Sequence, residues 1–130
     1  MVGLVIVSHS QALAESVVGL TSMMAKDAKI AAAGGLEDGN FGTSFARISE
    51  AIEAVYSDDG VIILMDLGSA VMTTEMVLEM MDGRKVVMAD CPLVEGAVVA
   101  SVDAAGGMSL EEIIADLAGV WDMRKLPEAR

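Results

Sequence analysis

The chain has 130 residues, a formal net charge of −12 at pH 7, 54% hydrophobic residues and only 3% aromatic residues. A chain of this length fits one domain, which buries roughly 68% of the surface that its unfolded form exposes. The acidity disfavours nucleic acid as a partner, because it repels phosphate backbones, and favours a basic protein surface. With so few rings, aliphatic residues and eleven methionines must build the core.

The composition also indicates where in the cell the protein is expected. The longest purely apolar run, residues 61–65, is far shorter than the roughly 18 residues that a membrane span requires. The first residues carry no Lys or Arg of the kind that begins a signal peptide, and the single cysteine, Cys91, has no partner for an internal disulfide. We therefore expect a cytoplasmic protein that does not enter a membrane.

Strand-like and helix-like patterns alternate along the chain. A short apolar run predicts the first strand at 2–7, and apolar spacings of three and four predict a helix over 13–24. In chain order, the further expected elements are a strand at 29–33, a helix at 45–55, a strand at 61–65, a helix at about 69–81, a strand at 85–89 and a helix from Pro92 to Gly106. The last helix begins at the S-x-x-E capping box of Ser109 and Glu112 and runs to Trp121, and residues 124–130 form a flexible tail.

This alternation predicts the fold class. Strands of nearly continuous apolar character, each followed by a helix, are typical of a parallel sheet that is covered on both faces. We expect an α/β fold, a three-layer α/β/α sandwich with a central, mainly parallel four-stranded sheet in the order 2-1-3-4.

The predicted topology points to a site. In open parallel sheets, ligands bind outside the carboxyl ends of the strands, where the strand order reverses. Here that crevice lies between the ends of the first and third strands. The first strand ends in Ser8, His9 and Ser10, and the third is followed by Asp66, Gly68 and Ser69. The only histidine of the chain and a carboxylate are thus expected to meet there.

Backbone groups suited to phosphate are expected around that histidine. Ser8 to Gln11 match an S-x-x-Q capping box, which would place His9 at the first position of a helix, among free N–H groups. The segment Gly42, Thr43 and Ser44 adds glycine flexibility and hydroxyls at a second helix start.

The chemistry that these groups favour is phosphoryl transfer through a phosphohistidine. A neutral imidazole is a competent nucleophile near pH 7, and a carboxylate on its other nitrogen orients it and stabilises the developing positive charge. In this hypothesis His9 accepts and donates the phosphoryl group and Asp66 orients it. The plainer interpretation is a partly exposed polar histidine beside an aspartate that only caps a helix.

Other chemistry lacks its usual motifs. The sequence contains no G-x-x-x-x-G-K-[ST], no G-x-G-x-x-G after a strand, no H-E-x-x-H and no C-x-x-C. With one histidine and one cysteine, a metal site would have to be built from carboxylates, so we expect neither metal nor cofactor. Pro92 follows Cys91 and no second histidine exists to activate the thiol, which indicates a structural cysteine.

At these residues the chain resembles a known family. The segments "VGLVIVSHSQALAE", "GTS", "VIILMDLGSAVMTTEM" and "PLVEGAVVAS", which cover nearly the whole chain, are similar to the phosphotransfer subunits (DhaM) of phosphoenolpyruvate-dependent dihydroxyacetone kinase. "MDLGSA" followed by "TTE" is the most specific of them. Their domain is of the enzyme IIA type of mannose phosphotransferase systems, so residues 1–123 are expected to form such a phosphotransfer domain.

The resemblance implies a pathway for the phosphoryl group. His9 would receive it from the histidine phosphocarrier protein HPr and pass it to ADP on a partner kinase subunit, DhaL. Asp66 matches the supporting acid of the family and residues 42–44 match a loop at the site. Members are homodimers, which would give the C-terminal helix with Trp121, or the methionine-rich third helix, a surface to cover. Two alternatives stay open: a non-catalytic regulatory or dimerisation module of this fold, and a flavodoxin-like binder of a small anion.

Overall fold

A computed structural model describes residues 1–126, and residues 127–130 of the expected tail lie outside the described residues. One sheet of four strands has the order β2-β1-β3-β4, and all three pairings are parallel. The predicted α/β fold and strand order are confirmed. The strands are β1 (Gly3–Ser8), β2 (Lys29–Gly34), β3 (Val61–Met65) and β4 (Val86–Met88).

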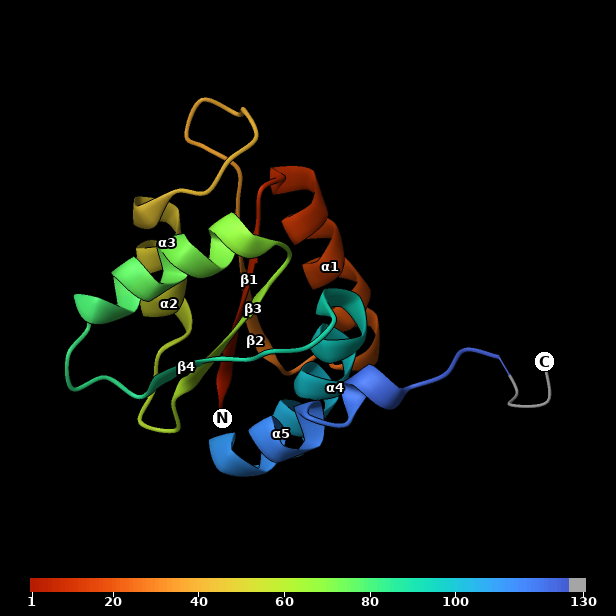
Figure 1. Cartoon of the computed structure of the whole chain (residues 1–130). Coiled ribbons are helices and arrows are strands. Elements are labelled where there is room, and N and C mark those ends of the chain that lie inside the picture. The colour runs from red at the N-terminus through yellow and green to blue at the C-terminus, as the bar shows by residue number, and fades with distance from the viewer. Residues whose placement is uncertain (127–130) are drawn as a thin grey trace.

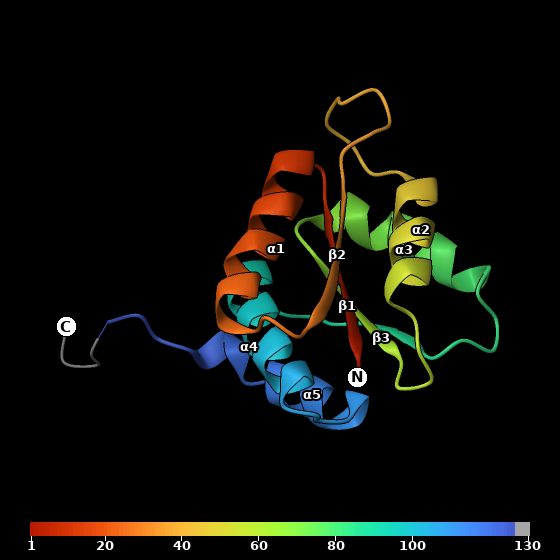
Figure 2. The same cartoon turned by 180° about the vertical axis from the view of Figure 1, so that it is seen from behind.

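Helices cover both faces of the sheet and complete the three layers (Figures 1 and 2). One face carries α1 (Gln11–Met24), α4 (Leu93–Ala105) and α5 (Leu110–Leu117). The other carries α2 (Phe45–Val55) and α3 (Gly68–Glu79). Each crossover passes through a helix, as parallel strands require.

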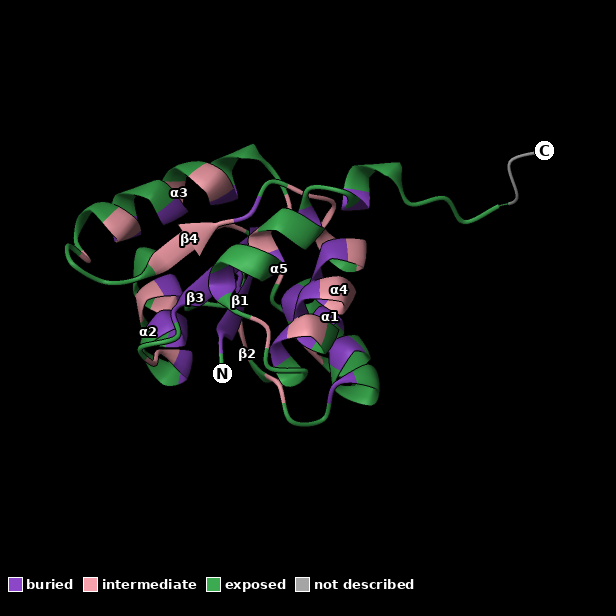
Figure 3. Ribbon diagram, turned by 90° about the horizontal axis from the view of Figure 1, so that it is seen from below, coloured by how far each residue is buried: buried purple, intermediate pink, exposed green. Residues whose placement is uncertain are grey.

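The alternation of side chains along β1 divides the core into two halves. Leu4 and Ile6 belong to the cluster under α1, α4 and α5, whereas Val5 and Val7 belong to the cluster under α2 and α3. This is the two-residue period of a strand that is buried on both faces. Figure 3 shows β1 and β3 as buried ribbons between the helical layers.

The chain ends its helices earlier than the sequence pattern predicts in two places. The last helix stops at Leu117, and Trp121 lies in a separate 3₁₀ turn, η1 (Val120–Asp122). There the hydrogen bonds tighten to the i to i−3 pattern, with Gly119 N–H on Asp116 C=O and Asp122 N–H on Gly119 C=O. Likewise α3 ends at Glu79, because the next two N–H groups already bond three residues back.

Within residues 1–126, no helix combines the length and the apolar character that crossing a bilayer demands.

Candidate functional site

The ends of β1 and β3 lie side by side at the carboxyl edge of the sheet. Val7 pairs with Met65 in the parallel register, and the next N–H, that of Asp66, donates to the Val7 carbonyl at 3.1 Å. Asp66 therefore meets the turn that follows β1, where His9 is located. The meeting of these two residues, predicted from topology alone, is thus observed in the structure.

The Asp66 carboxylate accepts four hydrogen bonds. Its Oδ2 accepts from the Ser8 hydroxyl at 2.8 Å and from the His9 N–H at 3.0 Å, and its Oδ1 accepts from the Leu67 N–H at 2.6 Å and meets His9 Nδ1 at 2.9 Å. Burial raises the pKa of Asp66, but the bonds from His9, Ser8 and Leu67 outweigh it and hold the pKa below its ordinary value of 3.8. The group is therefore a carboxylate at neutral pH.

The ring of His9 is oriented by that carboxylate. An ionised carboxylate only accepts, so the neutral ring carries its hydrogen on Nδ1 and donates it to Asp66. The lone pair is then on Nε2, which faces the Ser69 hydroxyl at the start of α3. The His9 side chain is 28% exposed while that of Asp66 is 11% exposed, so the ring reaches solvent and its partner hardly does. The neutral ring therefore has an unprotonated nitrogen, Nε2, on the side away from Asp66.

The capping prediction for the first helix is wrong by two residues. Ser10, not Ser8, is the N-cap of α1, and its hydroxyl accepts from Leu13 N–H at 3.2 Å. His9 consequently precedes the helix instead of opening it, and its N–H is bound by Asp66 rather than free for an anion. Ser8 is taken away from the capping role because its buried hydroxyl donates to Asp66 and accepts from Ser10 N–H.

A glycine-rich loop between β2 and α2 closes the other side of the His9 turn, and Figure 1 shows it rising beyond the end of the sheet. Gly42 donates its N–H to the His9 carbonyl at 2.9 Å, with a φ of +150° that side chains rarely adopt. At Gly34, an added Cβ would lie 2.5 Å from the Ser10 carbonyl oxygen. Glycine is needed here because the backbone of β2 passes this close to the histidine turn.

The hydroxyls of this loop point in different directions. Thr43 shares a 2.8 Å hydrogen bond with the Thr73 hydroxyl of α3, and Thr73 also bonds the Ser69 carbonyl at 3.1 Å. Ser44 is the N-cap of α2, accepting from Arg47 N–H, and it donates to Glu37. The Ser44 hydroxyl is therefore used away from His9, as is that of Ser10, whereas Ser69 faces the ring directly.

Thr73 is a site residue that the sequence analysis did not name. It ties the loop at Thr43 to the same turn of α3 that presents Ser69. The "TTE" segment was recognised as specific to the family, which was the available signal, but nothing in its spacing indicates a partner 30 residues away. Gly68 starts α3 in open space, where an added Cβ would touch nothing within 4 Å.

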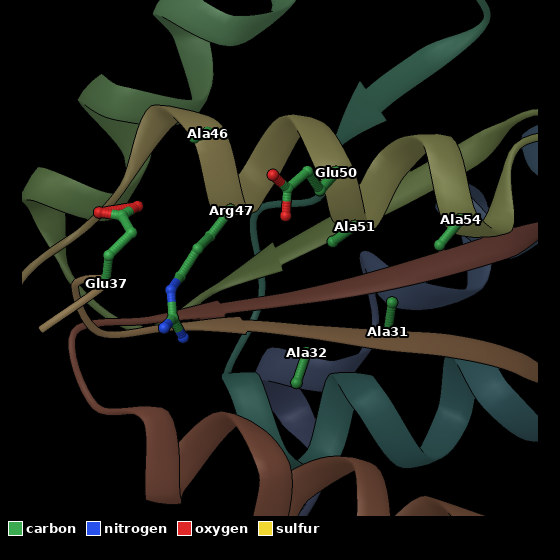
Figure 4. A pocket seen from close by; sticks show the side chains of 8 residues that line it. All are labelled: Ala31, Ala32, Glu37, Ala46, Arg47, Glu50, Ala51 and Ala54. Atoms are coloured by element: carbon green, nitrogen blue, oxygen red, sulfur yellow. The ribbon is translucent and has the colours of Figure 1, made fainter. Parts of the chain in front are cut away.

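A groove between α2 and β2 is separate from this site. It measures about 450 Å³ and is lined by short alanine side chains and by Glu37, Arg47 and Glu50 (Figure 4). Arg47 uses its guanidinium to bond the Gly34 carbonyl at the end of β2. None of the predicted site residues lines the groove, and we assign no chemistry to it.

Two further features concern metals and thiols. Within the described part of the chain, no cluster of three or more His, Cys, Asp or Glu residues could hold a metal ion. Cys91 is half-buried, and burial together with the nearby Asp90 raises its pKa to about 11. The thiol is therefore protonated at neutral pH and is a poor nucleophile.

With this geometry established, comparison with known proteins identifies the family. The EIIA-man family model, described as the PTS system fructose IIA component, matches residues 3–114, which include His9, the glycine loop and Asp66. The chain belongs to the EIIA-man family.

Curated relatives of this EIIA-man chain are DhaM subunits, so the resemblance seen in the motifs is confirmed. "PTS-dependent dihydroxyacetone kinase, phosphotransferase subunit DhaM" of Lactococcus lactis is 41% identical, with 85% of this chain matching 89% of that protein. The DhaM subunit of Escherichia coli K12 is 42% identical over 89% of this chain. The chain spans about a quarter of that protein and of its Providencia stuartii counterpart, 26% and 25% respectively.

Solved structures share the EIIA-man fold over almost the full length. The unknown-function protein EF1359 is 27% identical with a TM-score of 0.85, and the superposition covers 97% of this chain and 98% of that one. A phosphotransferase system component EIIA from Streptococcus agalactiae has a TM-score of 0.69 at 12% identity, with 92% of both chains covered. The second likeness concerns the fold alone.

Proposed function

We propose that the chain is the phosphohistidine relay of a phosphoenolpyruvate-dependent dihydroxyacetone kinase, with His9 as the residue that carries the phosphoryl group. The supporting observation is the orientation of the ring, in which Nδ1 is held by the Asp66 carboxylate and Nε2 is left unprotonated and partly exposed. The names of the DhaM relatives agree with a donor role in such a kinase.

In the first half-reaction, Nε2 of His9 attacks the phosphorus of the phosphohistidine on HPr. The new N–P bond forms as the old one breaks, and the electron pair of the old bond returns to the imidazole of HPr. The His9 ring becomes positively charged, and the charge is stabilised by Asp66 at 2.9 Å from Nδ1. The Ser69 hydroxyl, which faces Nε2, is placed to donate to a phosphoryl oxygen.

In the second half-reaction, a β-phosphate oxygen of ADP on DhaL attacks the same phosphorus. The Nε2–P bond breaks, ATP forms, and the electron pair returns to His9 as a neutral ring. Because the transferring group has a loose transition state, the site contributes mainly by position and by fixed dipoles.

Labelling tests the proposal directly. The chain is incubated with radiolabelled phosphoenolpyruvate, the general phosphotransferase enzyme I and HPr, and the bound phosphate is then characterised. We expect label that is lost in acid and kept in alkali, as a phosphoramidate is, with a stoichiometry of one per chain and none on His9→Ala.

The outcomes separate the candidate functions. Label that persists in His9→Ala would remove that residue from the mechanism. A parent chain that folds yet takes up no label would favour the non-catalytic regulatory or dimerisation module. Transfer of the label to ADP only when DhaL is added would assign the recipient, and generation of ATP without it would contradict the second half-reaction.

We further propose a cytoplasmic homodimer. Met72 and Met76 on α3 and Met80 at its C-cap follow one another at intervals of four, and these residues are 67%, 57% and 77% exposed. Figure 3 shows that much of α3 is exposed. A second copy would remove these methionines from water, and sedimentation equilibrium at micromolar concentration measures whether it does.

A further inference from the structure

A second hollow adjoins the histidine site on the far side of the β3–α3 loop. It measures about 610 Å³. It is lined by residues 65–68 and Val71 from the end of β3 to the first turn of α3, by residues 88–91 from the end of β4 and the segment after it, and by Trp121 of η1. Asp66 lines the hollow and also bonds His9, so the two places are adjacent. We expect a protein that exchanges a group with His9 to contact this hollow as well.

The walls of the hollow combine apolar surface with negative charge. Leu67 and Trp121 are 67% and 61% exposed, and the Trp121 indole is fixed in place by a 3.1 Å hydrogen bond from Nε1 to the Asp90 carbonyl. Two carboxylates, Asp66 and Asp90, are among the lining residues, which include no Lys or Arg.

The two carboxylates are not equivalent. Asp66 is mostly buried and already accepts four hydrogen bonds, so its charge is hardly available to a cationic group of a partner protein. Asp90 is exposed, and its carboxylate makes no hydrogen bond or ion pair with any residue of 1–126. The available charge of the hollow is therefore that of Asp90, whose backbone carbonyl also holds the indole N–H of Trp121.

We propose that this hollow is the docking socket for a Lys or Arg side chain of HPr, an inference that rests on the proposed function. Such a side chain has an aliphatic stem that suits Leu67 and Val71, and a cationic head that suits both an indole face and a carboxylate. The net charge of −12 attracts a basic partner surface over a longer range. The socket fixes where HPr sits relative to His9 and takes no part in the chemistry.

The single tryptophan gives a direct readout of the socket. A ¹⁵N-labelled sample of the chain has one indole N–H resonance, which is followed while unlabelled and unphosphorylated HPr is added. We expect that resonance to shift and saturate with HPr, and the shift to weaken as NaCl is raised. An indole resonance that stays in place at saturating HPr would refute the socket.

Kinetics of His9 labelling with phosphorylated HPr give the second test. Asp90→Asn keeps the size of the side chain but removes its charge, so we expect a KM for HPr raised about five- to tenfold with kcat unchanged and a shallower salt dependence. The matched control is Asp122→Asn, a neighbour of Trp121 that does not line the hollow, and it should leave KM unchanged. Trp121→Phe retains an aromatic face and should cost less than Trp121→Leu.

The failures are distinguishable. A parent chain that is never labelled contradicts the proposed function, while the indole titration still reports docking. A parent chain that is labelled normally, together with an Asp90→Asn chain of identical KM, refutes the socket alone. A resonance that shifts with the concentration of the chain itself, and not with HPr, would assign the hollow to contact between two copies and would also overturn the proposal.

Discussion

Asp66 joins structure and chemistry in one side chain. Two of its hydrogen bonds, from the Ser8 hydroxyl and the His9 N–H, hold the ends of β1 and β3 together, and a third comes from the adjacent Leu67 N–H. The fourth, at 2.9 Å to Nδ1, sets the tautomer of His9, the proposed nucleophile. A substitution of Asp66 therefore changes which ring nitrogen of His9 carries the proton, and it also weakens the contact between the ends of β1 and β3.

Asp66→Asn tests the tautomer. The two donors that face Oδ2, the Ser8 hydroxyl and the His9 N–H, favour the amide oxygen there, which turns the NH₂ toward Nδ1. Nδ1 must then accept, so the ring proton moves to Nε2 and removes the attacking lone pair. We expect the rate of His9 labelling to fall by about 10²-fold or more, while the circular dichroism spectrum stays that of the parent. A ¹⁵N shift of the ring that still reports hydrogen on Nδ1 would contradict this explanation.

At the scale of the elements, α4 and α5 meet through two acids. Asp103 on α4 lies beside Asp116 on α5, and its Oδ2 is buried without a hydrogen-bond partner among residues 1–126. Burial, followed by the hydrogen bond and the charge of Asp116, raises the pKa of Asp103 from 3.8 to about 6. The folded chain thus holds a proton there that the unfolded chain has already lost.

The sign of the resulting pH dependence follows from linkage. Between pH 3.8 and about 6 the folded state binds more protons than the unfolded state, so the contribution of Asp103 to stability is present at low pH and is lost as the pH rises. Asp103→Asn should remove this loss and increase the free energy of unfolding at pH 7 by about 1 kcal/mol. Urea unfolding at several pH values measures the difference, with Asp122→Asn as the control. An asparagine variant less stable than the parent at pH 7 would contradict the assignment.

The element pattern was predictable because it depends on local composition. Apolar runs and helical spacings are read along the chain, and the order 2-1-3-4 is a common solution for such a pattern. His9 and Asp66 could be placed together for the same reason, since the topology alone brings the ends of β1 and β3 to one edge. The capping box at Ser109 is equally local and is present as predicted.

The hydroxyl partners could not be predicted, because each depends on a residue that is distant in sequence. Ser8 matches the S-x-x-Q pattern and Ser10 does not, yet Ser10 is the N-cap, because Asp66, 58 residues away from Ser8, takes the Ser8 hydroxyl. The Thr43–Thr73 bond depends in the same way on the path of the glycine loop. Trp121 had a helical spacing, but the tight turn at Gly119 takes it out of α5.

At the scale of the whole molecule, charge is the main imbalance. The chain carries 20 acidic and 8 basic residues, so the compact state brings like charges together and loses stability to their repulsion. Exposed ion pairs such as Arg84–Glu53 at 3.0 Å offset little of this.

Salt should therefore stabilise the fold. Raising NaCl from 0.01 to 0.1 M shortens the screening length from about 30 Å to about 10 Å, and we expect the melting temperature to rise by about 3 °C. A calorimetric scan at each salt concentration measures it, and KCl at equal ionic strength should give the same rise. A melting temperature that falls with salt would show that attractive pairs dominate.

The hydrogen bonds that join the ends of β1 and β3 through the Asp66 carboxylate also affect the rate of the proposed relay. In the proposed relay the imidazole keeps a single pose through loading and unloading, since its support is anchored in the sheet edge and not in a swinging segment. No lid has to open or shut between the two half-reactions. In this scheme the rate of phosphoryl transfer depends on how quickly one partner protein dissociates from the site and the next one binds. The concentrations of the partner proteins then limit that rate more than any motion within this chain.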